Sequence, residues 1–210
     1  MQTDSKNIIN IDIEAERALT FATELFQTGR IFIYPTDTIY GIGGNPLNQK
    51  VVNRISEIKG RDEQKRFIWL ISDIDNLLNY TDFAIESHIE ILQKIWPAPL
   101  SVILKLNERT SELLNQKTVA VRIPSDKFCL NLLKEISRPL ISTSVNRTGE
   151  NPLYRTDLII EEFSDKVDAI LFHTESPERK SSTIIDLTTN KPKLIREGAI
   201  KFVELLQNFT

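Results

Sequence analysis

"IFIYPTDTIYGIGG", residues 31–44, joins an apolar run, a proline and a cluster of hydroxyl and carboxyl groups to three glycines. The aromatic and β-branched residues at 31–34 predict a buried strand that ends at Pro35. The glycines predict a turn of the kind that cradles phosphates, although they match neither G-x-G-x-x-G nor a P-loop, which needs a lysine. Thr36, Asp37 and Thr38 are therefore expected at the mouth of a strand.

Length and composition predict one folded domain over residues 1–210. The chain is 40% hydrophobic and 26% charged, as is typical of globular proteins. Its net charge of −3 disfavours binding to nucleic acid by bulk charge but allows a local basic cleft. Cys129 is the only cysteine, which excludes an intramolecular disulfide and a cysteine-based zinc site. Without an apolar leader or a membrane-length apolar run, we expect a cytoplasmic protein with no membrane partner.

Helical and strand patterns alternate through the first two thirds of the chain, and the last third is richer in strands and turns. Helical periodicity predicts helices at 13–28, 49–58, 83–95, 126–136, 156–163 and 199–207. Strands are predicted at 31–34, 67–71, 100–106, 118–123, 139–144, 169–173, 182–188 and 192–197. This order predicts an α/β fold: a single domain with a twisted sheet of parallel and antiparallel strands and flanking helices.

Several of the predicted strands carry polar side chains at or near their ends. They are Thr36–Thr38, Arg122, Ser142–Asn146, Ser182–Thr183 and Arg196. Any one hydroxyl can simply satisfy nearby backbone, and an arginine can serve a structural ion pair. Because ligands bind beyond strand ends in open α/β sheets, the coincidence predicts a site for an anionic ligand.

"VVNRISEIKGR", residues 51–61, predicts a short helix that ends at Gly60. Lys59 and Arg61 flank this end. One interpretation is favourable charge near a helix C-terminus on a solvated surface. The other is a cationic clamp, with lysine for a phosphate and arginine for a carboxylate.

The residues that are scarce also narrow the chemistry. With only His88 and His173 in the chain, a Ser-His-Asp triad or a histidine metal site is improbable. No pair of carboxylates indicates glycoside hydrolysis. The kind of catalysis that remains works by positioning the reactants and neutralising their charge, as in nucleotidyl and phosphoryl transfer.

Seven segments together resemble the YrdC/TsaC family of L-threonylcarbamoyladenylate synthases. They are "YPTDTIYGIG" at 34–43, "KGR" at 59–61, "WPAPLSVIL" at 96–104, "VAVRIP" at 119–124, "STSVNRTGENP" at 142–152, "STIIDL" at 182–187 and "IREG" at 195–198. The resemblance covers about residues 12–200 and implies the YrdC-like fold with a central concave cleft. Because the chain stops at 210, the further C-terminal domain of longer members is expected to be absent.

The resemblance implies a reaction and its participants. L-threonine, bicarbonate and ATP would give threonylcarbamoyl-AMP and pyrophosphate, the first step toward N6-threonylcarbamoyladenosine at position 37 of tRNA. Mg²⁺ is expected with ATP, held mainly by phosphates and water rather than by a protein metal site. Expected partners are the proteins that transfer the threonylcarbamoyl group to tRNA, and a weak contact with tRNA itself.

The resemblance also implies roles for individual residues. Catalytic roles go to Lys59, Arg61, Ser144 and Asn146. Binding of L-threonine goes to Thr36, Arg61, Arg122 and Ser142. Binding of the nucleotide goes to Lys59, Thr118, Ser144, Asn146, Ser182 and Arg196.

Three departures from the family pattern surround these residues: Asp62 and Arg66 replace prolines, and Arg147 replaces a small residue. The main alternative is a non-catalytic YrdC-like paralogue that binds a nucleotide or RNA. The others are an RNA-binding module with a local basic cleft, and a carbamoyl-transferring domain normally fused to larger maturation factors. Intact K-x-R and S-x-N signatures favour the enzyme.

Overall fold

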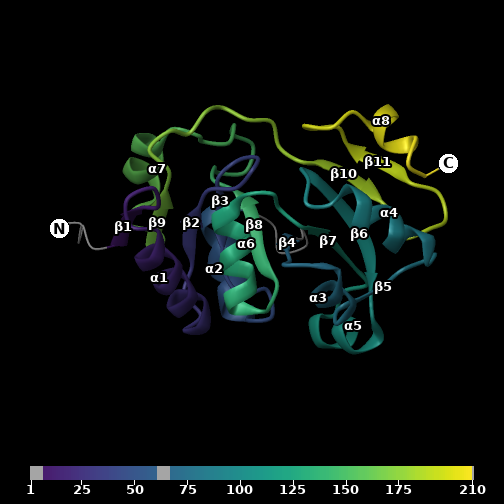
Figure 1. The fold of residues 1–210 in the computed structure, drawn as a ribbon. Helices are drawn as coiled ribbons and strands as arrows, with labels where there is room; N and C mark the ends of the chain where they lie inside the picture. Colours follow the sequence, from purple (N-terminus) through teal and green to yellow (C-terminus); the bar gives the residue numbers. More distant parts are fainter. Residues whose placement is uncertain (1–6, 61–66, 210) are drawn as a thin grey trace.

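A mixed β-sheet runs through the computed structural model, which describes residues 7–60 and 67–209 (Figure 1). Its strands follow the order β1-β9-β2-β3-β8-β4-β7-β6-β10-β11, and β5 pairs with β6 at the side. The strand bounds are β1 Ile8–Asn10, β2 Phe32–Tyr34, β3 Gly41–Gly43, β4 Ile68–Leu70, β5 Thr81–Asp82, β6 Leu100–Leu106, β7 Thr118–Arg122, β8 Leu140–Ser144, β9 Ala169–Phe172, β10 Thr183–Asp186 and β11 Lys193–Arg196.

The sheet mixes parallel and antiparallel pairs, as the alternation of helices and strands predicted. β9 lies parallel to both β1 and β2, whereas β3 is antiparallel to β2 and to β8. In the other half β4 is parallel to β7, and β6 is parallel to β10 but antiparallel to β7. The predicted fold class is confirmed.

The helices cover this sheet in groups. Their bounds are α1 Ala15–Gln27, α2 Gln49–Lys59, α3 Ile74–Leu78, α4 Ser87–Ile95, α5 Glu108–Leu114, α6 Lys127–Ile136, α7 Thr156–Phe163 and α8 Phe202–Leu206. The apolar sides of α1 and α6 pack on one face of the β1–β9–β2 half, and those of α2 and α7 pack on the other. Apolar residues of α3, α4 and α8 belong to a separate core around β6 and β7. None of the helices in the described ranges is both long and apolar enough to span a bilayer.

The prediction of a glycine-rich turn at 41–44 was wrong, because Gly41–Gly43 forms strand β3 inside the sheet. The reason is Tyr34, which is fully buried on the adjacent strand and donates a hydrogen bond from its hydroxyl to the carbonyl of Ile141 (2.9 Å). A Cβ added to Gly43 would lie 2.5 Å from Cε1 of Tyr34. Glycine is required here so that the tyrosine ring can cross the strand, and not to form a turn.

Other differences concern short elements. The strands β1 and β5 and the helices α3 and α5 were not predicted, because two to seven residues carry too little periodicity. Residues 83–86 were predicted to be helical, but α4 begins only at Ser87. The remaining predicted helices and strands are present, with ends shifted by a few residues.

Candidate active site

The C-terminal end of α2 carries Lys59 into the protein. Asn48 begins the helix by accepting a hydrogen bond from the N–H of Lys50 (3.1 Å), and Val51 and Ile55 bury its apolar stripe. Gly60 ends it in the left-handed conformation (φ 56°, ψ 40°), as the sequence predicted. Lys59 is only 3% exposed, so the interpretation of a solvated surface charge does not apply to it.

Lys59 lies against the end of β8. Its Nζ donates to the carbonyl oxygen of Ser144 (2.5 Å) and to Oδ1 of Asn146 (2.7 Å), with Ser144 Oγ at 3.3 Å. Ser144 Oγ also donates to Asn146 Oδ1 (2.5 Å). The structure therefore joins the lysine of K-x-R to both polar residues of S-x-N.

The orientation of the Asn146 amide is fixed by the loop that follows β8. Its Nδ2 donates to the carbonyl oxygens of Arg147 (2.8 Å) and Glu150 (2.7 Å), which leaves Oδ1 to face Lys59. The same loop is joined to α2, since the N–H of Thr148 donates to the carbonyl of Lys59 (2.9 Å). The lysine and the amide are thus preorganised by backbone from two separate elements.

A cavity of about 540 Å³, here the main cavity, lies over the central strands beside this network. Six of the residues with a predicted catalytic or binding role line it: Thr118, Arg122, Ser142, Ser144, Ser182 and Arg196. They come from β7, β8, β11 and the residue just before β10. Residues as far apart as 118 and 196 in the chain therefore meet at one site.

Arg122 is buried at the wall of the main cavity, with 3% exposure. Its Nη1 donates to Oγ1 of Thr38 (2.8 Å), and its Nη2 lies 3.4 Å from Oδ1 of Asp37. Its Nε has no hydrogen-bond partner among the described residues. A buried guanidinium with an unused N–H can donate a hydrogen bond to a ligand oxygen at little further desolvation cost.

Arg196 and Ser182 form a second polar group of the same cavity. Arg196 Nη2 donates to the carbonyl of Ser182 (2.9 Å), and the Ser182 hydroxyl is hydrogen-bonded to that of Ser101 (2.9 Å). Partial burial, and then the charge of Arg122, lower the pKa of Arg196 below its ordinary value. Two guanidinium groups that repel each other across one cavity are stabilised by a bound anion.

Thr36 was predicted at the site but is not among the residues that line the main cavity. Thr36 Oγ1 accepts from the N–H of Thr38 (3.0 Å) and donates to the carbonyl of Ile39 (2.7 Å), so it organises its own loop. Its side chain lines a neighbouring cavity and not the main one. Its role in binding threonine remains a prediction. Arg61, like Asp62 and Arg66, lies outside the described residues.

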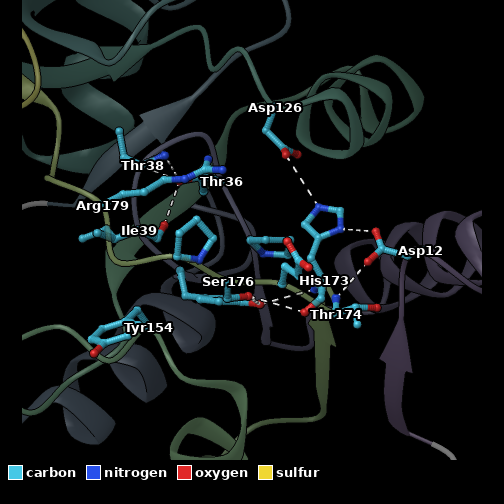
Figure 2. A pocket seen from close by; sticks show the side chains of 14 residues that line it. Asp12, Thr36, Thr38, Ile39, Asp126, Tyr154, His173, Thr174, Ser176 and Arg179 are labelled. Atoms are coloured by element: carbon cyan, nitrogen blue, oxygen red, sulfur yellow. Dashed lines mark hydrogen bonds and ion pairs between the residues drawn. The ribbon is translucent and has the colours of Figure 1, made fainter.

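The neighbouring cavity, here the side cavity, has a volume of about 480 Å³ and shares Thr38, Ile39 and Tyr40 with the main cavity (Figure 2). Sequence reasoning put His173 at the end of a predicted strand but missed that Asp12, Asp126 and Arg179 gather around the same space. Asp12 and His173 follow the parallel strands β1 and β9, so the rule of polar residues at strand ends could have found them. The apolar lining of the main cavity, such as Ile103 and Ile184, has no signal that separates it from core.

Comparison with known proteins identifies the family of this chain. A family model for Sua5/YciO/YrdC proteins, described as "Telomere recombination", matches residues 24–198. The curated threonylcarbamoyl-AMP synthase of Pyrococcus abyssi is 30% identical over 201 residues, which are 94% of this chain and 59% of that protein. The chain therefore spans about three fifths of the length of this relative.

Solved structures show the same likeness. P. abyssi Sua5 complexed with L-threonine superposes with a TM-score of 0.87 at 30% identity, over 96% of this chain and 60% of that one. Escherichia coli YciO superposes with a TM-score of 0.80 at 26% identity, over 93% of this chain and 94% of its own. Because the family model covers well over half of the chain, this protein belongs to the Sua5/YciO/YrdC family.

Proposed function

We propose that this protein synthesises L-threonylcarbamoyl-AMP and pyrophosphate from L-threonine, bicarbonate and ATP. The observation that carries the proposal is the buried Lys59–Ser144–Asn146 network at the wall of a cavity that also holds Arg122 and Arg196. The relative named threonylcarbamoyl-AMP synthase and the Sua5 structure that contains L-threonine support it.

The chemistry explains why cations and donors suffice. The amine of threonine combines with bicarbonate to form a carbamate, with loss of water. A carbamate oxygen then forms a bond to the α-phosphorus of ATP, while the bond from that phosphorus to the bridging oxygen breaks and releases pyrophosphate. Both reactants are anions, so the enzyme's task is to hold them together and neutralise their charge.

The proposed roles divide the site between the two substrates. Lys59 would bind the nucleotide phosphates, with Ser144 and Asn146 orienting its ammonium group and contacting the adenylate. Thr118, Ser182 and Arg196 would hold the rest of the nucleotide in the main cavity. L-threonine would bind Arg122 through its unused Nε–H, together with Ser142, Thr36 and Arg61.

Mg²⁺ would enter with ATP and be held mainly by phosphate oxygens and water. The donor set is compatible with this arrangement: within the described ranges, His, Cys, Asp and Glu form no group of three that could hold a metal ion. The proposal extends to the proteins that carry the product to tRNA, to a weak contact with tRNA itself and to a cytoplasmic location.

The test is pyrophosphate release from ATP and Mg²⁺, with and without L-threonine and bicarbonate. Release should require both co-substrates. Lys59→Ala should lower turnover roughly tenfold to a thousandfold, or about 1.4–4 kcal/mol in the barrier. Lys50→Ala is the matched control, because it removes an exposed lysine from the first turn of the same helix.

Two results would count against the synthase. Release that is indifferent to threonine and bicarbonate would refute the reaction, and full turnover in Lys59→Ala would refute the role of the lysine. ATP binding without release under any condition would favour the non-catalytic paralogue instead.

A further inference from the structure

The side cavity contains polar groups for which the proposed reaction has no use. Asp12 at the end of β1, Asp126 at the start of α6, and the segment after β9 with His173 and Arg179 enclose it (Figure 2). It includes none of Lys59, Ser144 or Arg122.

Its acidic wall is built around His173. The Nδ1 of His173 lies 2.6 Å from Asp12 Oδ1, and its Nε2 lies 3.8 Å from Asp126 Oδ2. Asp12 Oδ2 also accepts a hydrogen bond from the N–H of Thr174 (2.8 Å). This N–H first, and the imidazole second, lower the pKa of Asp12, so its carboxylate is charged at neutral pH.

Asp126 belongs to the same wall. Its Oδ1 accepts from the N–H of Cys129 (2.8 Å) and begins α6, which leaves Oδ2 on the side of His173. Its side chain keeps 15% exposure and that of Asp12 keeps 44%, so both carboxylates remain accessible to a ligand.

The opposite side of the side cavity carries a positive charge and aromatic surface. Arg179, whose Nη1 donates to the carbonyl of Asp37 (3.2 Å), lies across from His173 and Asp12 (Figure 2). Tyr40 also lines the cavity, and its hydroxyl is hydrogen-bonded to Ser176 (2.6 Å). Tyr154, 37% exposed, adds a second ring.

The charges around the cavity do not balance. Besides His173, its lining holds the carboxylates of Asp12, Asp126 and Glu175 against the single guanidinium of Arg179. Carboxylates that remain accessible in a cavity suit an organic cation, through charge-assisted hydrogen bonds. A metal ion is a poor candidate, because among the residues described no three His, Cys, Asp or Glu side chains are grouped so that they could hold one.

We propose that the side cavity binds a small organic ammonium ligand, with the ammonium group against Asp12 and Asp126. Two kinds of molecule share this chemistry. A plain amine would use the acidic wall alone, whereas an amino acid would also place its carboxylate toward Arg179. Asp12, Asp126 and Arg179 do not line the main cavity, so the proposal does not need the synthase reaction, although the side cavity also contains Thr36.

Three probes of similar size separate these cases in a calorimetric titration of the whole chain without ATP. They are n-butylamine, 4-aminobutanoate and the uncharged n-butanol. We expect an ammonium probe to bind with a dissociation constant on the order of 1 mM, given so few ligand atoms. Butanol should not bind.

Conservative variants assign the binding to the cavity. Asp126→Asn keeps a good helix cap, and Asp12→Asn keeps an acceptor for the N–H of Thr174, while each removes one charge. Each should weaken binding about tenfold. Glu112→Gln on α5, an exposed carboxylate outside the cavity, is the control and should change nothing. Thermal midpoints would verify that each variant is folded.

Arg179→Gln separates the two kinds of ligand. A loss of affinity for 4-aminobutanoate but not for butylamine would identify the amino-acid class, and no loss of affinity for either probe would identify the plain amine. The proposal is overturned if neither ammonium probe binds, if butanol binds equally well, or if both aspartate variants bind like the wild type. None of these results depends on whether pyrophosphate is released.

Discussion

Gly43→Ala should destabilise the protein, because its methyl group would enter space that Tyr34 fills. The added Cβ would lie 2.5 Å from Cε1 and 3.1 Å from Cδ1 of that ring, and 3.1 Å from the carbonyl oxygen of Ile141, whereas ordinary contacts are 3.4–4 Å. The ring cannot move aside freely, since it is fully buried and its hydroxyl is bonded to the same carbonyl (2.9 Å).

The magnitude follows from three contributions. Overpacking a dense core costs about 1–3 kcal/mol. Loss of the tyrosine hydrogen bond would add about 0.5–1.5 kcal/mol. Replacing glycine lowers the entropy of the unfolded chain and returns about 0.4–1 kcal/mol. The expected net loss in the free energy of unfolding is therefore between about 0.5 and 4 kcal/mol, with a central value of about 2 kcal/mol.

Urea unfolding of the wild type, Gly43→Ala and the control Gly41→Ala tests this reasoning. In the control the new Cβ lies 3.1 Å from Ser142 Oγ and 3.3 Å from the nearest ring atom of Tyr34. Gly41→Ala should therefore lose less than half as much free energy of unfolding as Gly43→Ala. The slope of free energy against urea should stay constant. A Gly43→Ala protein within about 0.5 kcal/mol of wild type would refute the argument that glycine is needed for the tyrosine.

The remaining predictions concern pH, the amide at the site and one partly buried carboxylate. Burial lowers the pKa of His88 below its ordinary value of 6.5, so stability is full above pH 6.5 and falls as the pH drops below it; urea midpoints at pH 7.5 and 5.5 should fall less in His88→Leu than in the wild type. Asn146→Ala should lower pyrophosphate release at least about tenfold, because Lys59 loses its 2.7 Å acceptor, and an unchanged rate would show that the amide is not needed. Asp168→Asn should cost about 1–2 kcal/mol in urea unfolding, because Asp168 accepts from the N–H of Ile31 and from Arg54; a cost below about 0.3 kcal/mol would contradict that role.

The parts of the fold that the sequence predicted share a strong local signal. Helix α2 has an apolar stripe, a capping asparagine and a C-terminal glycine, and its end was predicted to within one residue. Strand β3 was missed because its reason lies in a neighbouring strand: only the position of the Tyr34 ring explains two glycines in a sheet interior. Local pattern cannot report a contact between residues that do not share a segment.

The candidate site, like the fold, has a part that the sequence predicted and a part that it did not. Residue types and strand ends indicated an anionic ligand, and the structure brings six of the predicted polar residues to one cavity. The depth of Lys59 was not predictable, because a lysine before a helix-ending glycine is usually solvated. Its burial depends on the loop of residues 146–150, whose backbone orients Asn146 and is joined to the carbonyl of Lys59.

The burial of Lys59 and Arg122 bears on what the main cavity can bind. Removing a charged group from water costs several kcal/mol unless partners compensate it, and both residues are only 3% exposed. Lys59 donates hydrogen bonds to a carbonyl, an amide oxygen and a hydroxyl oxygen. Arg122 has one carboxylate at 3.4 Å and an Nε without a partner among the described residues. An anion in the main cavity would compensate the charge of Arg122 directly. The empty protein should therefore be measurably stabilised by pyrophosphate alone, and thermal midpoints with and without it would show this before any turnover is assayed. A midpoint that pyrophosphate leaves unchanged would mean that the cations serve the fold and not a ligand.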